Sequence, residues 1–131
     1  MAKLVNEGEN HFLEILLGTT NVDSNLYLGL YLNSTEPEET ATLADITEPT
    51  GGGYTRIALA RGSWTITNDV AIFAQQTFKP SGVNWGNTYG YFIANTSDNS
   101  GVLIIVEDFT DGPYSVTNKD EVKVIPQITM S

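Results

Sequence analysis

The chain has 131 residues, no cysteine, and sixteen acidic against six basic residues, for a formal net charge of −10 at pH 7. This length predicts one compact domain over residues 1–131, and the lack of cysteine excludes disulfides and thiolate metal sites. An acidic surface repels phosphate backbones and anionic lipids, so we expect neither a nucleic-acid partner nor a membrane. Such a surface is consistent with simple solvation, with dense packing of the protein beside copies of itself, or with docking on a basic partner.

No apolar run reaches the roughly 20 residues that a bilayer-spanning helix needs. The N-terminus, MAKLVNEGEN, holds one lysine and no apolar signal core. We therefore expect synthesis in a cytoplasm without processing.

The segment 1–18 is predicted to contain a short helix. Asn6 and Glu9 have the spacing of a capping box, and Gly18 is typical of a helix C-terminus. A helix this short is marginal alone, so its apolar face must pack on the sheet of its own chain or on a neighbouring subunit. That face consists of Phe12, Leu13, Ile15, Leu16 and Leu17.

The hydrophobic pattern changes to a period of two in NLYLGLYL, residues 25–32. Four leucines alternate with Tyr27, Gly29 and Tyr31, which predicts a strand with one strongly apolar face. The tyrosines on the opposite face indicate a half-wet, half-buried surface of the kind found at interfaces.

Residues 33–53, NSTEPEETATLADITEPTGGG, form a long acidic loop that is expected to be either functional or disordered. Leu43 and Ile46 are candidates to pin it locally. A phosphate-binding loop needs a strand before its glycines and a helix after them, and here that order is reversed. We instead predict that Gly51–Gly53 adopt positive φ or pass close to another backbone. Arg56 follows, where it can pair with the preceding acids.

Further short strands are predicted in the rest of the chain. Residues 89–94 and 102–108 are joined by the hairpin turn NTSDNSG, and Pro126 places the last strand, 121–129, at an edge or a bulge. This succession predicts an all-β fold, a β-sandwich or jelly-roll with a short N-terminal α-helix. The other candidate strands are 54–60, 64–67, 71–74 and 76–78.

Groups for catalysis or metal binding are sparse, and no cofactor is predicted. His11 lacks a serine nucleophile motif and companion ligands, so we interpret it as a surface or capping residue. Glu107, Asp108 and Asp111 form a carboxylate cluster, but spacing alone does not separate a catalytic pair or a weak cation site from a solvated loop. Trp64, Trp85 and the tyrosines fit core packing, a sugar-stacking face or subunit contacts.

Five segments that run through nearly the whole chain carry a resemblance to known proteins. They are HFLEILLG (11–18), LYLGLYLNSTEP (26–37), TEPTGGGYTR (47–56), TFKPSGVNWGNTYGYFIA (77–94) and the strand after NKDEVKV (118–124). Their order resembles a family of small bacteriophage virion proteins, described as head-decoration or tail-fibre proteins. The resemblance implies a non-enzymatic β-domain that oligomerises, often as a trimer, on a phage particle. It also implies a glycine-containing turn where this sequence has Lys119-Asp120.

We therefore expect a capsid-decorating (cement) protein of the virion, a homotrimer that contacts the major capsid protein and its own copies through the N-terminal segment and a wider contact surface. One alternative is a tail-fibre or baseplate module that binds a host-surface glycan in an exposed aromatic and carboxylate groove near Trp64 or Trp85. Another is a small hydrolase that uses the 107–111 cluster. The expected contact surface comprises Tyr27, Tyr31, Gly51, Gly52, Gly53, Tyr54, Arg56 and Trp85.

Overall fold

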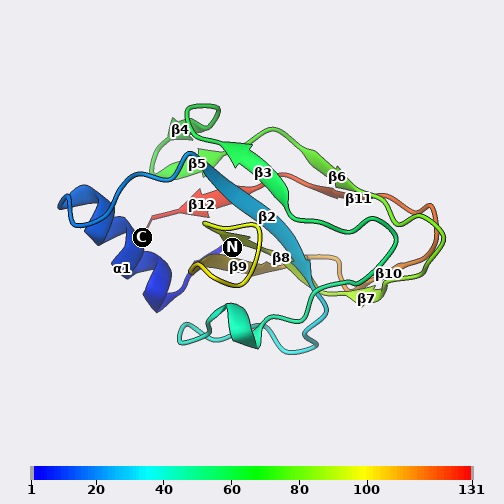
Figure 1. The fold of residues 1–131 in the computed structure, drawn as a ribbon. Coiled ribbons are helices and arrows are strands. Elements are labelled where there is room, and N and C mark those ends of the chain that lie inside the picture. The colour runs from blue at the N-terminus through cyan, green and yellow to red at the C-terminus, as the bar shows by residue number, and fades with distance from the viewer. Residues whose placement is uncertain (1, 131) are drawn as a thin grey trace.

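The computed structural model describes residues 2–130 and has an all-β fold with one α-helix (Figure 1). The helix α1 spans Asn6–Leu16, and a 3₁₀ helix, η1, spans Leu43–Asp45. Within residues 2–130 all strand pairs are antiparallel. The strands are β1 (Lys3–Leu4), β2 (Asn25–Tyr31), β3 (Ile57–Ala60), β4 (Thr65–Thr67), β5 (Val70–Ile72), β6 (Gln76–Phe78), β7 (Gly86–Thr88), β8 (Gly90–Ala94), β9 (Leu103–Asp108), β10 (Tyr114–Val116), β11 (Val122–Val124) and β12 (Gln127–Thr129).

The largest sheet has five strands in the order β1-β9-β8-β2-β3. Its central strands β8 and β9 are buried on both faces, as expected for near-continuous apolar runs. The register places Leu28 opposite Ile93 and Leu30 opposite Tyr91. These four side chains point to one face, where they join the main hydrophobic core.

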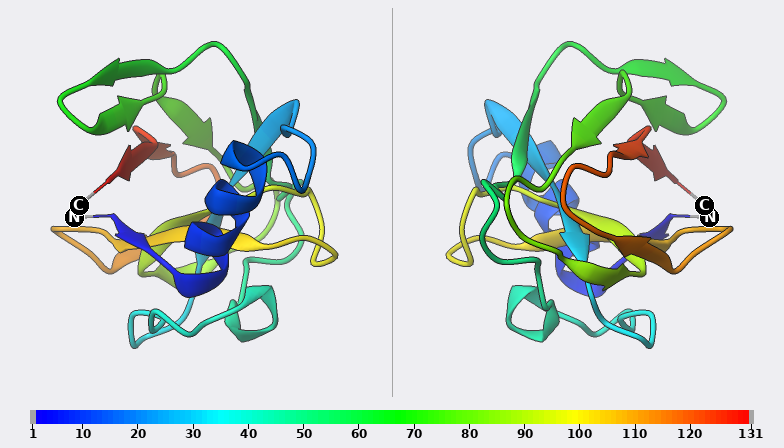
Figure 2. Two further views of the ribbon diagram at one scale, coloured as in Figure 1. Left: turned by 90° about the vertical axis from the view of Figure 1, so that its left-hand side faces the viewer. Right: turned by 90° about the vertical axis from the view of Figure 1, so that its right-hand side faces the viewer.

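Two different layers cover the two faces of this sheet (Figure 2). One layer consists of the sheets β12-β5-β4 and β11-β6, whose Phe78, Val122, Val124 and Ile128 complete the main core. The other is the acidic loop, which places Ala41, Leu43 and Ile46 in a second cluster with Tyr31 and Phe92. The central sheet therefore buries both faces, although only one of them meets other strands.

The acidic loop is ordered by local hydrogen bonds. Thr42 and Asp45 form a capping box around η1, and the Asn33 side chain bonds the Asp45 carbonyl oxygen and the Thr47 N–H. Leu43 and Ile46 are buried, so the prediction that they pin the loop is confirmed.

Burial of both sheet faces corrects the interpretation of the tyrosine face of residues 25–32. Tyr31 is fully buried beneath the acidic loop, because that loop, and not solvent, covers its side of the sheet. Tyr27, nearer the start of β2, is half-buried.

Two predicted strands have clearly different boundaries in the structure, and three short strands were not predicted. The strand expected at 54–60 begins only at Ile57, and the one expected at 121–129 is divided into β11 and β12 around Ile125 and Pro126. The short strands β1, β7 and β10 were not predicted, because two or three residues are too few to show a period.

The predicted capping box at the start of α1 is wrong. The N-cap residue is Val5, without a side-chain cap. Tertiary contacts replace the box: the Asn6 N–H donates to the Glu39 carbonyl oxygen at 2.8 Å, and the Glu7 carboxylate accepts from the Leu103 N–H at 2.6 Å. The helix start is thereby tied to both the acidic loop and β9.

Candidate interaction surface

The helix α1 packs on its own chain through a face other than the leucines. Its buried residues are Gly8 and His11. A side chain at Gly8 would collide with the Ile104 backbone, so this glycine lets α1 lie directly on β9. Because successive residues turn by about 100° around a helix axis, packing through this face leaves the leucines pointing outward.

His11 is a buried anchor of the helix, which corrects its interpretation as a surface or capping residue. Its Nε2 lies 2.6 Å from Oδ2 of Asp23, and Asn95 Nδ2 lies 3.4 Å from the same ring nitrogen. These contacts join α1 to the segment before β2 and to the end of β8. They hold the helix, and the leucines it carries, in a fixed position.

Three leucines are exposed: Leu13 and Leu16 in α1, and Leu17 directly after it. The exposed fractions are 54% for Leu13, 78% for Leu16 and 73% for Leu17. Isolated apolar residues are normal on a protein surface, but contiguous groups mark interaction sites. We call Leu13, Leu16 and Leu17 the leucine ridge.

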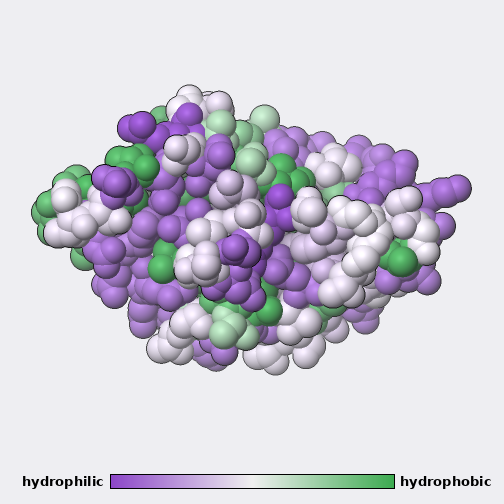
Figure 3. Space-filling model, viewed as in Figure 1, coloured by the Kyte–Doolittle hydropathy of each residue, from purple (hydrophilic) through white to green (hydrophobic). Residues whose placement is uncertain are grey.

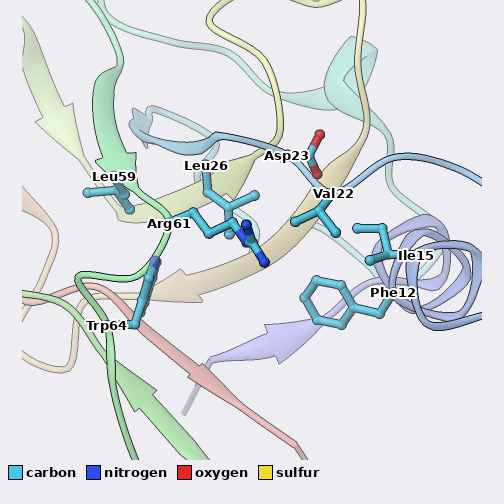
Figure 4. Close-up of a pocket in the computed structure, with 8 residues that line it drawn as sticks. All are labelled: Phe12, Ile15, Val22, Asp23, Leu26, Leu59, Arg61 and Trp64. Carbon is cyan, nitrogen blue, oxygen red and sulfur yellow. The ribbon is translucent and has the colours of Figure 1, made fainter. Parts of the chain in front are cut away.

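A hollow of about 180 Å³ lies beside this helix (Figure 4). Phe12, Ile15 and Val22 line one side of it, and Trp64 and Arg61 face them across the gap. Leu26, Leu59 and Asp23 complete the lining. Apolar side chains dominate the hollow, and Arg61 supplies a cation there.

A second hollow shares Phe12 with the first. It is lined by Ile66 of β4, Ala71 of β5, Ile128 of β12, Met130 and Asp69. Ile66 and Met130 are themselves exposed. The two hollows and the leucine ridge therefore form one largely apolar end of the molecule, and Figure 3 shows hydrophobic residues at this end beside a mostly hydrophilic surface.

The eight residues expected at the contact surface lie elsewhere, and the structure does not bring them into one exposed patch. The side chains of Tyr31, Arg56 and Trp85 are buried within this chain. Gly51 and Gly53 are exposed, while Tyr27, Gly52 and Tyr54 are half-buried. Their role in contacts between subunits stays a prediction, but a neighbouring copy would reach only the glycines and parts of Tyr27 and Tyr54.

Arg56 instead holds the acidic loop on the sheet. Its guanidinium forms two hydrogen bonds to the Glu48 carboxylate, at 3.0 and 2.8 Å, and lies 5.0 Å from the ring centroid of Phe92. It also donates to three oxygens of residues 96–99 in the β8–β9 turn. A pairing with the preceding acids was predicted, but its burial was not.

Tyr54 extends the same network. Its hydroxyl donates to Glu48 Oε1 at 2.6 Å and accepts from the Leu30 N–H at 3.0 Å. Burial, followed by the Glu48 carboxylate, raises the pKa of Tyr54 far above its usual range. The polar groups of this region therefore satisfy one another within the chain.

The glycine triplet has the backbone predicted for it. Gly51, Gly52 and Gly53 have φ of 76°, 63° and 81°, in the left-handed region that favours glycine. A side chain at Gly52 would approach Cγ2 of Val83 to 2.6 Å. The Gly51 carbonyl oxygen accepts from Trp85 Nε1 at 3.1 Å. The triplet is a tight structural turn against the segment before β7.

Two carboxylates of the 107–111 cluster, Glu107 and Asp108, take part in contacts that stabilise the sheet. The Tyr31 hydroxyl donates to Asp108, and Tyr91 faces Glu107. Burial raises the pKa of both tyrosine hydroxyls, and the neighbouring carboxylates raise it further. Among residues 2–130 no group of three or more histidine, aspartate or glutamate side chains is placed to hold a metal ion.

The apolar end was only partly visible in the sequence. The helix face containing the leucines was identified, and a neighbouring subunit was one of its two expected partners. Arg61, Ile66 and Met130 were missed, because their relevance depends on tertiary contacts that bring β4, β12 and α1 to the same end. In the described part of the chain no helix is both long and apolar enough to cross a membrane.

No protein-family model and no curated protein matches this sequence.

Proposed function

We propose that this chain is a non-enzymatic structural protein of a bacteriophage virion, which decorates and stabilises the capsid as a homotrimer. Its partners are the major capsid protein and its own copies. The fold that we propose for this role is a β-sandwich of the jelly-roll class. The pairing of the five-stranded sheet with the layer of β4, β5, β6, β11 and β12 supports the sandwich.

The observation that carries the proposal is the apolar end in an otherwise acidic chain. The leucine ridge and the hollows around Phe12 form a surface suited to another protein. The net charge of −10 keeps free trimers apart from one another. A decoration protein meets both needs, since it must stay dispersed before assembly and then adhere through many small contacts.

The arrangement of polar groups also favours a structural role. Glu48, Tyr54 and Arg56 are engaged with each other, and Asp108 is engaged with Tyr31. These groups hold the acidic loop and the sheet together.

Immunogold labelling of intact particles tests the proposal. Antibodies raised against the folded chain should label the heads of the phage whose genome encodes it. Particles that lack the protein should lose their genome at a lower temperature, and adding the purified chain back should restore them. Particles without any label would contradict the proposal.

A second candidate function is a tail-fibre or baseplate module that binds a host glycan. It is favoured by the hollow in which Trp64 lies with Arg61 and Asp23, as an aromatic and carboxylate groove would require. Against it, Trp85 is buried, and the Asp23 carboxylate is already engaged by His11 and Asn95. Label at the tail tip, together with glycan binding that Trp64→Ala abolishes, would favour this candidate.

A further inference from the structure

We propose that the leucine ridge of one copy inserts into the Trp64 hollow of the next copy, so that α1 links the subunits head to tail. This inference rests on the proposed function, because it identifies the surface through which the copies meet. The occupant of the hollow is thus a second copy of this chain.

The shapes and chemistry of the two parts are complementary. The ridge is a row of outward apolar side chains, 54–78% exposed. The hollow is lined mainly by Phe12, Ile15, Val22 and Leu26, and its volume of about 180 Å³ suits side chains and not a large ligand. Insertion would remove both apolar surfaces from water in one step.

Charges at the rim are compatible with this occupant, since Arg61 and the Asp23 carboxylate, which His11 and Asn95 already engage, both line the hollow. Arg61 borders the hollow, and within residues 2–130 no hydrogen bond or ion pair engages its guanidinium. Glu14 is exposed on α1 three residues before Leu17, so it lies beside the ridge on the helix surface. When one copy inserts its ridge, its Glu14 approaches Arg61 of the receiving copy. Arg61 is one of only six basic residues in the chain.

The proposed trimer determines the type of contact. We assign a heterologous contact, in which each copy inserts its ridge into one neighbour and receives the ridge of another, because an isologous contact would give a dimer and not the trimer of the proposed function. Such contacts close into rings when the rotation between copies allows it. A ring of three agrees with the trimer of the proposed function.

The position of α1 is fixed firmly enough for this role. Gly8 seats it against β9, and His11 bonds Asp23, which itself lines the hollow. Ridge and hollow therefore keep a constant spacing, and less conformational freedom is lost on association.

Light scattering coupled to size exclusion, with the full-length chain over a range of concentrations, tests the inference. Wild type should have three times the mass of one chain. Leu16→Asp should raise the dissociation constant by about 30-fold or more, as expected for a central interface residue. The matched control is Ile125→Asp, because Ile125 is 49% exposed but lines neither hollow. Circular dichroism of each variant verifies that it folds.

Swapping the charges of Arg61 and Glu14 is a second, independent test of the contact if the aspartate variant fails to fold. Arg61→Glu alone and Glu14→Arg alone should each weaken association by about tenfold, and the double variant should restore it. A trimer that persists in Leu16→Asp, or a double variant no better than the single ones, would overturn the inference. A monomeric wild type that still labels phage heads would overturn this inference and the homotrimer, while leaving decoration of the capsid standing.

Discussion

Replacing Arg56 with methionine tests how the acidic loop is held on the sheet. Methionine keeps an apolar stem near the Phe92 ring but removes the guanidinium. Five hydrogen bonds are lost, two to Glu48 and three to the turn at residues 96–99. The loop and the turn would then lack their shared cation.

The expected cost follows from burial of the ion pair. The Arg56 side chain is 2% exposed and the Glu48 side chain 21%. Removing one partner of a buried pair costs about 3–5 kcal/mol, because the other charge is left uncompensated. Since Glu48 keeps some contact with water, we expect a loss of about 3 kcal/mol in the free energy of unfolding. For a domain of this size that loss lowers Tm by about 12 °C.

Urea unfolding followed by tryptophan fluorescence measures this cost. Lys79→Met is the control, because Lys79 is exposed and has no ion pair within the described part of the chain, and it should change stability by less than about 0.5 kcal/mol. Adding Glu48→Gln to Arg56→Met should cost less than the sum of the two single variants, since they share one interaction. A cost below about 1 kcal/mol for Arg56→Met would refute the proposed role of the pair.

Three further predictions concern backbone conformation and pH. Gly52→Ala should destabilise the protein more than Gly53→Ala, because both positions have positive φ but only Gly52 also faces Val83, at 2.6 Å; equal losses in urea unfolding would contradict this. Lys119, with φ of 73°, occupies a conformation that suits glycine, so Lys119→Gly should stabilise the fold by about 0.5–1 kcal/mol, and a loss of Tm would count against it. Because burial and Asp108 raise the pKa of Tyr31, folding favours its protonated form, and stability should be constant below the unfolded-state pKa of about 10 and fall above it by up to about 1.4 kcal/mol per pH unit. Urea unfolding from pH 8 to 12 should show this fall, and Tyr31→Phe should reduce its slope; a slope unchanged in Tyr31→Phe would refute the assignment.

Local patterns predicted the elements whose periodicity is strong. The alternation of NLYLGLYL predicted β2, and the apolar runs at 89–94 and 102–108 predicted β8, β9 and the turn between them. The three glycines predicted a backbone of positive φ. Pro126 predicted an edge or a bulge in one last strand, and the structure instead has a break there between β11 and β12.

Burial on the second face of the central sheet was not predictable from the same patterns. A loop with many acids gives no sign that Leu43 and Ile46 will cover Tyr31. The buried state of Arg56 depends on a glutamate eight residues earlier and a turn about forty residues later. Only the folded chain brings these partners together.

The orientation of α1 was ambiguous for a related reason. Helical periodicity identified an apolar arc, but the arc is wider than the face that packs. Gly8 and His11 determine which side meets β9, through a close backbone approach and a bond to Asp23. Because that side packs on β9, the leucine ridge is left exposed and becomes part of the candidate interaction surface.

Cryo-electron microscopy of intact particles tests the central proposal most directly. We predict density for this fold on the outside of the capsid, in groups of three, with the α1 end covered by a neighbouring copy. Particles whose heads carry no such density, or on which the α1 end of every copy faces solvent, would contradict it.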